Sequence, residues 1–337
     1  MRFGTSALIG IWLAAVLGCA GTGRSYQRPP KLSRQEIRAS TAELGSETIS
    51  NLVELRTRMK NVEYRLVTAS ARHCGELARP RLGAIFSSRK SFEHEVLQGV
   101  AHREYAIGDR LTVVYVVPEG PLDRARFEPG DQILKVNGEM FRTANDLGDF
   151  LLEHSDLKSV RIRFRRGDAV RETLVQLASA CPVFFSIAAS PMIVAWQNSR
   201  LLVAVSVGLL NYVESDDELA VALSHQVAHA LFDQQGDSTV EEETRADFEG
   251  LRIAAIAGYD VSSALEYWES VAREYPWLID LESGIGGLPW SGYDEFPHHG
   301  IAQRMRAIRS RVRAIEANLA SSQTESSATR KSDSGSD

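Results

Sequence analysis

Apolar residues recur along the chain with different periods, and the change of period divides the sequence into blocks. Residues 34–72 carry apolar side chains at intervals of three or four, which predicts a helical arm packed on the body of the protein. Residues 79–178 instead hold short apolar runs between turn-forming residues, which predicts a strand-rich domain. Residues 160–164 alternate apolar and basic side chains, as expected for a half-exposed strand.

The second half of the chain returns to helical spacing after two more strand-like runs. The runs cover residues 183–187 and 201–207. Ser215, with Glu218 three residues later, has the pattern of a capping box, which fixes where the first helix of this half begins. Four helices are predicted, near residues 216–233, 240–257, 260–274 and 299–318.

The N-terminus has the pattern of an export signal. Arg2 precedes an apolar run, residues 7–17, that is too short to cross a bilayer as a mature helix. Residues 16–19, with the sequence VLGC, resemble the processing box of bacterial lipoproteins. That resemblance implies cleavage before Cys19, lipid on its sulfur, and a periplasm-facing protein anchored in the membrane of a bacterial cell envelope. The alternative is an ordinary secretory signal in which Cys19 has no role.

Cysteine content and charge narrow the picture further. If Cys19 is lipidated, Cys74 and Cys181 remain, and export makes a disulfide between them feasible. The alternative is two buried free thiols. The net charge is −6, and the chain has no Lys- or Arg-rich tract, which argues against a nucleic acid partner.

These patterns predict an α+β protein with a polar tether behind the signal and a Ser-rich, disordered tail. The expected divisions are a signal peptide at 1–18, a tether at 19–33, a helical arm at 34–74, a β-rich domain at 75–179, a mainly helical domain at 180–319 and the tail at 320–337.

The β-rich domain contains three turn-bearing segments in a characteristic order: VVPEGP at 116–121, FEPGD at 127–131 and ILKVNG at 133–138. With these segments it resembles a PDZ domain of the bacterial type. Such domains add an extended peptide to a sheet edge and receive its terminal carboxylate on backbone N–H groups. The resemblance places the peptide-binding loop at Leu82, Gly83, Ala84 and Ile85. The alternative is another small β-rich domain with a Gly-Asp turn.

The most informative segment of the helical domain is HQVAH, residues 225–229. Two histidines at i and i+4 lie on one helix face, where they can share a zinc ion or form ordinary hydrogen bonds in a core. The segment resembles the zinc-peptidase motif H-E-x-x-H with Gln226 in the place of Glu. In that motif the Glu takes a proton from the zinc-bound water, which a Gln cannot do.

A third ligand is expected from the next helix. Glu243 and Asp247 are four residues apart and share a face with Gly250 and Ala254, whose small size allows close packing. Two His and one Glu, with water in the fourth position, are a common catalytic zinc site.

Together these residues resemble the HtpX-like and CaaX-prenyl-protease-like zinc metallopeptidases, in particular exported lipoprotein members with a PDZ domain. Residues 243–247 match the family pattern E-x-x-A-D in full. The resemblance implies a metallopeptidase fold in which His225, His229 and Glu243 bind zinc and Asp247 orients a ligand histidine. The catalytic residues would be Gln226, in the position of the general base, and His298, which would lie near the substrate. The chain departs from the family at Gln226, at Val194 in place of an Asn, and in the short segment between His229 and Glu243.

Three functions remain open at this point. The chain is expected to be an impaired peptidase homologue that binds peptides or unfolded envelope proteins, because Gln226 removes the base. The first alternative is an active zinc endopeptidase of envelope protein quality control, in which Glu218 or Glu242 replaces that base. The second is a PDZ adaptor without metal.

Overall fold

The computed structural model of the protein describes residues 33–199, 201–231, 240–274 and 304–318. The chain divides into two units, Met1–Thr41 and Ala42–Asp337. The expected signal peptide, Cys19, most of the tether, His298 and the tail lie outside the described residues. Among the helices that are described, none is both long and apolar enough to cross a membrane.

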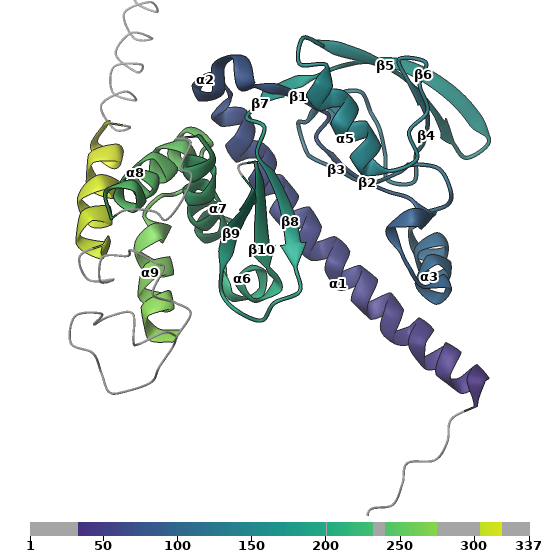
Figure 1. The fold of residues 1–337 in the computed structure, drawn as a ribbon, viewed down its shortest axis with the longest axis horizontal. Helices are drawn as coiled ribbons and strands as arrows, with labels where there is room; N and C mark the ends of the chain where they lie inside the picture. Colours follow the sequence, from purple (N-terminus) through teal and green to yellow (C-terminus); the bar gives the residue numbers. More distant parts are fainter. Residues whose placement is uncertain (1–32, 200, 232–239, 275–303, 319–337) are drawn as a thin grey trace, which may run out of the picture. The chain divides into compact units, whose positions relative to one another are not determined.

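The expected helical arm forms a single long helix, α1 (Arg34–Ala69), followed by α2 (Ala71–Cys74) and the short helix η2 (Gly75–Leu77) (Figure 1). Its side chains Leu55, Met59, Val62, Leu66 and Val67 are buried in the core that the helical domain forms. The helix thus packs on the body as its 3–4 spacing predicted, and its apolar stripe forms part of that core.

The PDZ-like region is built on an antiparallel sheet in the order β2-β3-β4-β5-β6. Val160, Ile162 and Phe164 alternate with exposed arginines on one strand, as predicted, and pack with Leu147 and Phe150 of a helix on the inner face. The elements are η3 (Arg89–Ser91), α3 (Glu95–Tyr105), α4 (Pro121–Arg124), α5 (Ala144–Glu153), β2 (Ala84–Ser87), β3 (Thr112–Val116), β4 (Gln132–Val136), β5 (Ser159–Arg166) and β6 (Ala169–Gln176).

Two further features of this region are an Asn-Gly turn and the helix α3. Asn137 and Gly138 have φ angles of 50° and 90°, the left-handed backbone that an Asn-Gly turn provides. The helix α3 was not expected. Only Val100 and Ala101 are buried along it, so its apolar spacing is too sparse to show a helical period.

The two ends of the β-rich block are held together. The strands β1 (Arg79–Arg81) and β7 (Ala178–Ala180) pair antiparallel. Beside them Cys74 and Cys181 form a disulfide with their Cα atoms 5.6 Å apart.

The helical domain opens with a three-stranded sheet in the order β8-β10-β9, in which β10 runs parallel to β8 and antiparallel to β9. The edge strand β9 and the short helix α6 were not expected. The strand run at 201–207 ends early because Ser206 caps α6, its Oγ accepting from the N–H of Leu209 at 3.0 Å. The strands are β8 (Phe184–Ala188), β9 (Ala195–Ser199) and β10 (Leu202–Ser206).

Helices make up the rest of the domain, and all four predicted ones are present. The predicted helices are α7 (Asp216–Leu231), α8 (Val240–Ile256), α9 (Ser263–Glu274) and the helical residues 304–318, and the unexpected α6 (Val207–Tyr212) precedes them. Figure 1 shows α7 and α8 side by side. A Cβ atom on Gly250 of α8 would lie 2.8 Å from the backbone nitrogen of His225 on α7. This close approach brings the polar faces of the two helices together.

Candidate metal centre and peptide groove

The helix α7 begins at a capping box, as its sequence predicted. The N–H of Glu218 donates to Ser215 Oγ at 3.1 Å, and Glu218 Oε2 accepts from the N–H groups of Glu214 and Ser215. These bonds satisfy N–H groups that the first turn of a helix leaves without partners. They fix the start of the helix that carries both histidines.

His225 and His229 come from successive turns of α7 and face the same side. Their Nε2 atoms are 2.9 Å apart, and their side chains are 14% and 8% exposed. Imidazoles this deeply buried need polar partners. The second helix supplies them.

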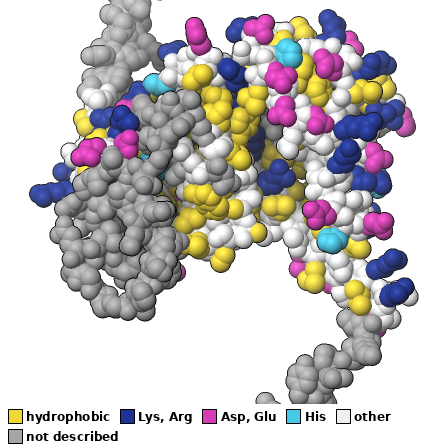
Figure 2. Space-filling view, in the orientation of Figure 1, with side chains coloured by type: hydrophobic (Ala, Val, Ile, Leu, Met, Phe, Trp, Pro, Cys, Tyr) yellow, Lys and Arg dark blue, Asp and Glu magenta, His cyan; other side chains and the backbone are white. Residues whose placement is uncertain are grey.

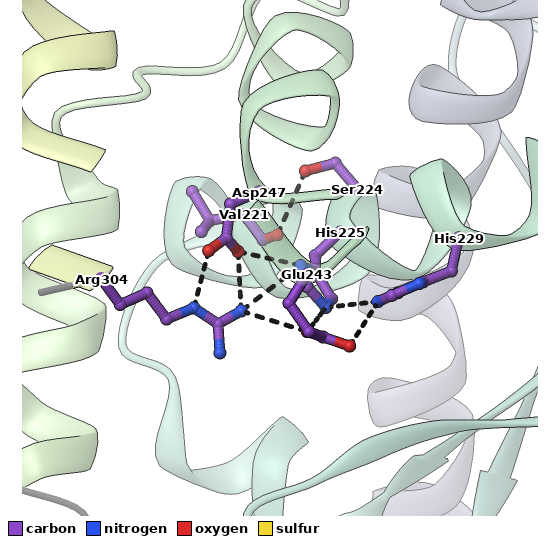
Figure 3. Close-up of polar contacts among 7 residues, drawn as sticks. All are labelled: Val221, Ser224, His225, His229, Glu243, Asp247 and Arg304. Carbon is purple, nitrogen blue, oxygen red and sulfur yellow. Dashed lines mark hydrogen bonds and ion pairs between the residues drawn. The ribbon is translucent and has the colours of Figure 1, made fainter. Parts of the chain in front are cut away.

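Glu243 of α8 points between the two imidazoles (Figure 3). Its Oε2 is 3.4 Å from His225 Nε2, and its Oε1 is 3.3 Å from His229 Nε2. Burial raises the pKa of Glu243, but hydrogen bonds from both histidines lower it more, so that its pKa lies far below the usual value. The carboxylate is therefore ionised and faces both rings.

Asp247, one turn further along α8, contacts the other nitrogen of His225. Its Oδ1 lies 2.9 Å from His225 Nδ1. A carboxylate at Nδ1 favours the tautomer in which Nδ1 carries the proton. In that tautomer Nε2, on the side of Glu243 and His229, would offer its lone pair to a cation placed between these side chains.

Arg304 completes the cluster, and sequence reasoning had assigned it no role. Its Nε donates to Asp247 Oδ2 at 2.7 Å, and its Nη2 donates to Oδ1 at 2.6 Å. Its guanidinium carbon lies 3.8 Å from the ring centre of Trp268. Burial raises the pKa of Asp247, but the positive charge of Arg304 lowers it further, to about 2. Arg304 thus holds Asp247 ionised and fixed in orientation.

The donor atoms fit a zinc ion. His225, His229 and Glu243 each offer an atom within 4.8 Å of the others. Zinc bonds of about 2.0–2.1 Å in tetrahedral geometry place their ligand atoms about 3.3 Å apart. The observed separations of 2.9, 3.3 and 3.4 Å lie close to that value.

Three other residues singled out in the sequence, Gln226, Glu218 and Glu242, are not among the three grouped ligand candidates. Gln226 is half-buried on α7 beside His225. Glu218 lies about 10 Å along the helix axis from His225, and its carboxylate is taken up by the capping box. Glu242 leaves α8 about 100° away from Glu243. The carboxylate of Glu218 is thus held at the start of the helix, and a replacement base at Glu242 stays a prediction.

The predicted peptide loop precedes and enters β2, the edge strand of the PDZ sheet. Leu82 is buried in the domain core, while Ala84 and Phe86 are half-buried at its border. Gly83 has a φ of 68° and needs the freedom of glycine. The helix α5 packs against β2, so a peptide added at that strand edge would lie beside this helix.

Comparison with known proteins identifies the β-rich region. Residues 80–177 match the family model described as PDZ domain. No curated protein matches the chain. A solved structure titled "Crystal Structure of the HtrA3 PDZ Domain Bound to a Phage-Derived Ligand (FGRWV)" is 22% identical, covers 30% of this chain and 86% of that chain, and has a TM-score of 0.23.

The chain therefore contains a PDZ domain, and the alternative of an unrelated β-rich domain was wrong. The matched region ends at residue 177, before the helical domain begins. The resemblance of that domain to HtpX-like metallopeptidases remains a prediction.

Proposed function

We propose that this protein binds extended peptides through its PDZ domain and holds a zinc ion at a metallopeptidase-like site that is catalytically impaired. The observation that supports peptide binding is the edge position of β2 beside α5 in a region that matches the PDZ family. An edge strand presents backbone N–H and C=O groups to which a peptide can add as a further strand.

The loop before β2 is oriented to receive a terminal carboxylate. The carbonyl of Leu82 accepts from the N–H of Leu122 at 3.2 Å, and the carbonyl of Gly83 accepts from the N–H of Val117 at 2.9 Å. In a trans peptide the N–H lies opposite the preceding carbonyl. The N–H groups of Gly83 and Ala84 therefore point away from those partners, which leaves them for an anionic ligand.

Peptide binding is tested with a library of short peptides that end in a free carboxylate. Amidation of the best binder should weaken binding at least about tenfold, since a hydrogen-bonded charge at the loop is lost. Gly83→Ala should have a similar effect, because a Cβ there meets Pro121 and Tyr64 at 3.2 Å with φ at 68°. Gly108→Ala, with open space around it, is the control. Equal affinity for free and amidated peptides would contradict the proposal.

The proposal that catalysis is impaired rests on Gln226. The ligand set of His225, His229 and Glu243 fits zinc, and bound zinc would polarise a water molecule. The amide of Gln226 cannot take the proton from that water. Losing a general base costs on the order of 10²–10⁴ in rate.

A protease assay of the wild type beside Gln226→Glu tests this part of the proposal. The variant should cleave an unfolded protein substrate on the order of 10²–10⁴ times faster than the wild type. Equal rates in the two proteins would show that Gln226 does not limit the reaction. The convergence of the three ligands favours an active zinc endopeptidase as the second candidate. Chelator-sensitive cleavage by the wild type that survives Gln226→Ala and is lost in His225→Ala would support that candidate.

A further inference from the structure

The outer face of the PDZ sheet, opposite α5, carries cations that neither the peptide groove nor the metal centre uses. Because Val160, Ile162 and Phe164 of β5 point into the core, Arg161, Arg163 and Arg165 point outward and are exposed. The strand register places Lys135 of β4 beside Arg163, Leu174 of β6 beside Arg161, and Val170 of β6 beside Arg165. The register also places Glu172 of β6 beside Arg163. These outward residues form the basic face: Lys135, Arg161, Arg163, Arg165, Val170, Glu172 and Leu174.

The charge of this face is opposite to that of the whole chain, which has a net charge of −6. Among the outward residues that the register aligns on β4, β5 and β6, one is acidic: Glu172. It lies 3.4 Å from Arg161, but both side chains are about half exposed or more, so this ion pair is weak. Figure 2 shows several Lys and Arg side chains, with Asp and Glu side chains among them, over the part of the molecule that holds β5 and β6 in Figure 1.

The basic face also exposes two large aliphatic side chains. Leu174 is 54% exposed and Val170 is 46% exposed, each beside an arginine on the neighbouring strand. Guanidinium groups bind phosphate through paired hydrogen bonds, and aliphatic side chains beside them can enter the layer below a phosphate headgroup. The cations are spread over a sheet face, an arrangement that suits an extended anionic surface.

We propose that the basic face binds the surface of a bilayer that contains anionic phospholipids. Cations near such a surface are attracted to it over about one Debye length, roughly 8 Å at physiological salt. This interaction uses none of the residues of the peptide groove or the metal centre, and so it stands apart from the proposed function. An acidic protein is the competing occupant of the face.

The test uses residues 26–337, which keep every described element and omit the apolar segment at 7–17 that would bind vesicles by itself. Co-sedimentation is measured with vesicles of phosphatidylcholine and with mixed vesicles of phosphatidylcholine and phosphatidylglycerol. The wild type should bind the mixed vesicles and lose binding at high salt. The variant Lys135→Gln/Arg163→Gln/Arg165→Gln removes three charges. Each cation should contribute about fivefold to the affinity, so the variant should bind about a hundredfold more weakly than the wild type.

The matched control removes three exposed charges elsewhere, in Arg72→Gln/Arg103→Gln/Arg313→Gln, and should bind like the wild type. Thermal unfolding checks that both variants fold, and Arg163→Glu alone repeats the test if the triple variant unfolds early. Equal binding to neutral and mixed vesicles, or equal loss in the control, would overturn the proposal. Absence of vesicle binding by the wild type would also overturn it and would favour the acidic protein.

Discussion

At the scale of single residues, the candidate metal centre depends on residues that are not themselves proposed ligands. Asp247 fixes the ring of His225, and Arg304 fixes Asp247 through two hydrogen bonds of 2.6 and 2.7 Å. Gly250 acts differently, because its missing side chain lets α8 approach α7 closely enough for Glu243 to meet both histidines.

Gly250→Ala should destabilise the protein by about 1–3 kcal/mol, because the added methyl group overlaps the backbone of α7 and forces the helices apart. It should also weaken zinc binding, since the ligands sit on both helices. Denaturant unfolding and a zinc titration measure the two effects. Gly148→Ala on α5 is the control: its Cβ meets nothing within 4 Å, so it should raise stability by about 0.5–1 kcal/mol. A Gly250→Ala protein as stable as the control would show that the helices need no such contact.

The sequence reveals the candidate metal ligands but not Arg304, and the reason lies in the spacing of these residues along the chain. The i, i+4 pairs His225/His229 and Glu243/Asp247 are visible because a helix repeats within one segment. Arg304 belongs to a helix far along the chain, and only the tertiary structure brings it to Asp247. A physical argument could have indicated a residue such as Arg304, because a buried carboxylate such as that of Asp247 needs a cation as its partner.

At the scale of elements, caps determine where several helices and strands begin and end. Ser215 and Glu218 start α7, and Ser206 ends β10 by starting α6. The strands with alternating or β-branched residues were predictable. The edge strand β9, with the sequence AWQNS, was not, because three of its residues are polar and only its pairing with β10 makes it a strand.

The disulfide between Cys74 and Cys181 should stabilise the protein strongly, since it closes a loop across 107 residues of sequence. Cys74→Ser/Cys181→Ser should lose about 3–5 kcal/mol, mainly because the unfolded chain is no longer constrained. Urea unfolding of the wild type and the variant measures the difference, and a strong reductant should remove it. Equal stabilities without reductant would show that the two thiols are not joined in the folded protein.

At the scale of the whole molecule, one chain combines a PDZ domain with a helical domain in which three polar side chains, His225, His229 and Glu243, converge on one point. The PDZ domain could be recognised from its turn segments, because a turn needs particular residues, as the positive φ angles of Asn137 and Gly138 show. The candidate metal centre and its supporting residues come from α7, α8 and the helix at 304–318, so their geometry depends on packing that a linear pattern does not contain. Its chemistry therefore has to be measured on the folded protein.

The measurement that tests this account most directly is the metal content of the purified protein beside that of His225→Ala/His229→Ala. We predict about one zinc per wild-type chain, as a three-ligand protein site holds, and almost none in the variant. Less than about a tenth of an equivalent in the wild type, or equal zinc in both proteins, would contradict the claim that these side chains bind one ion.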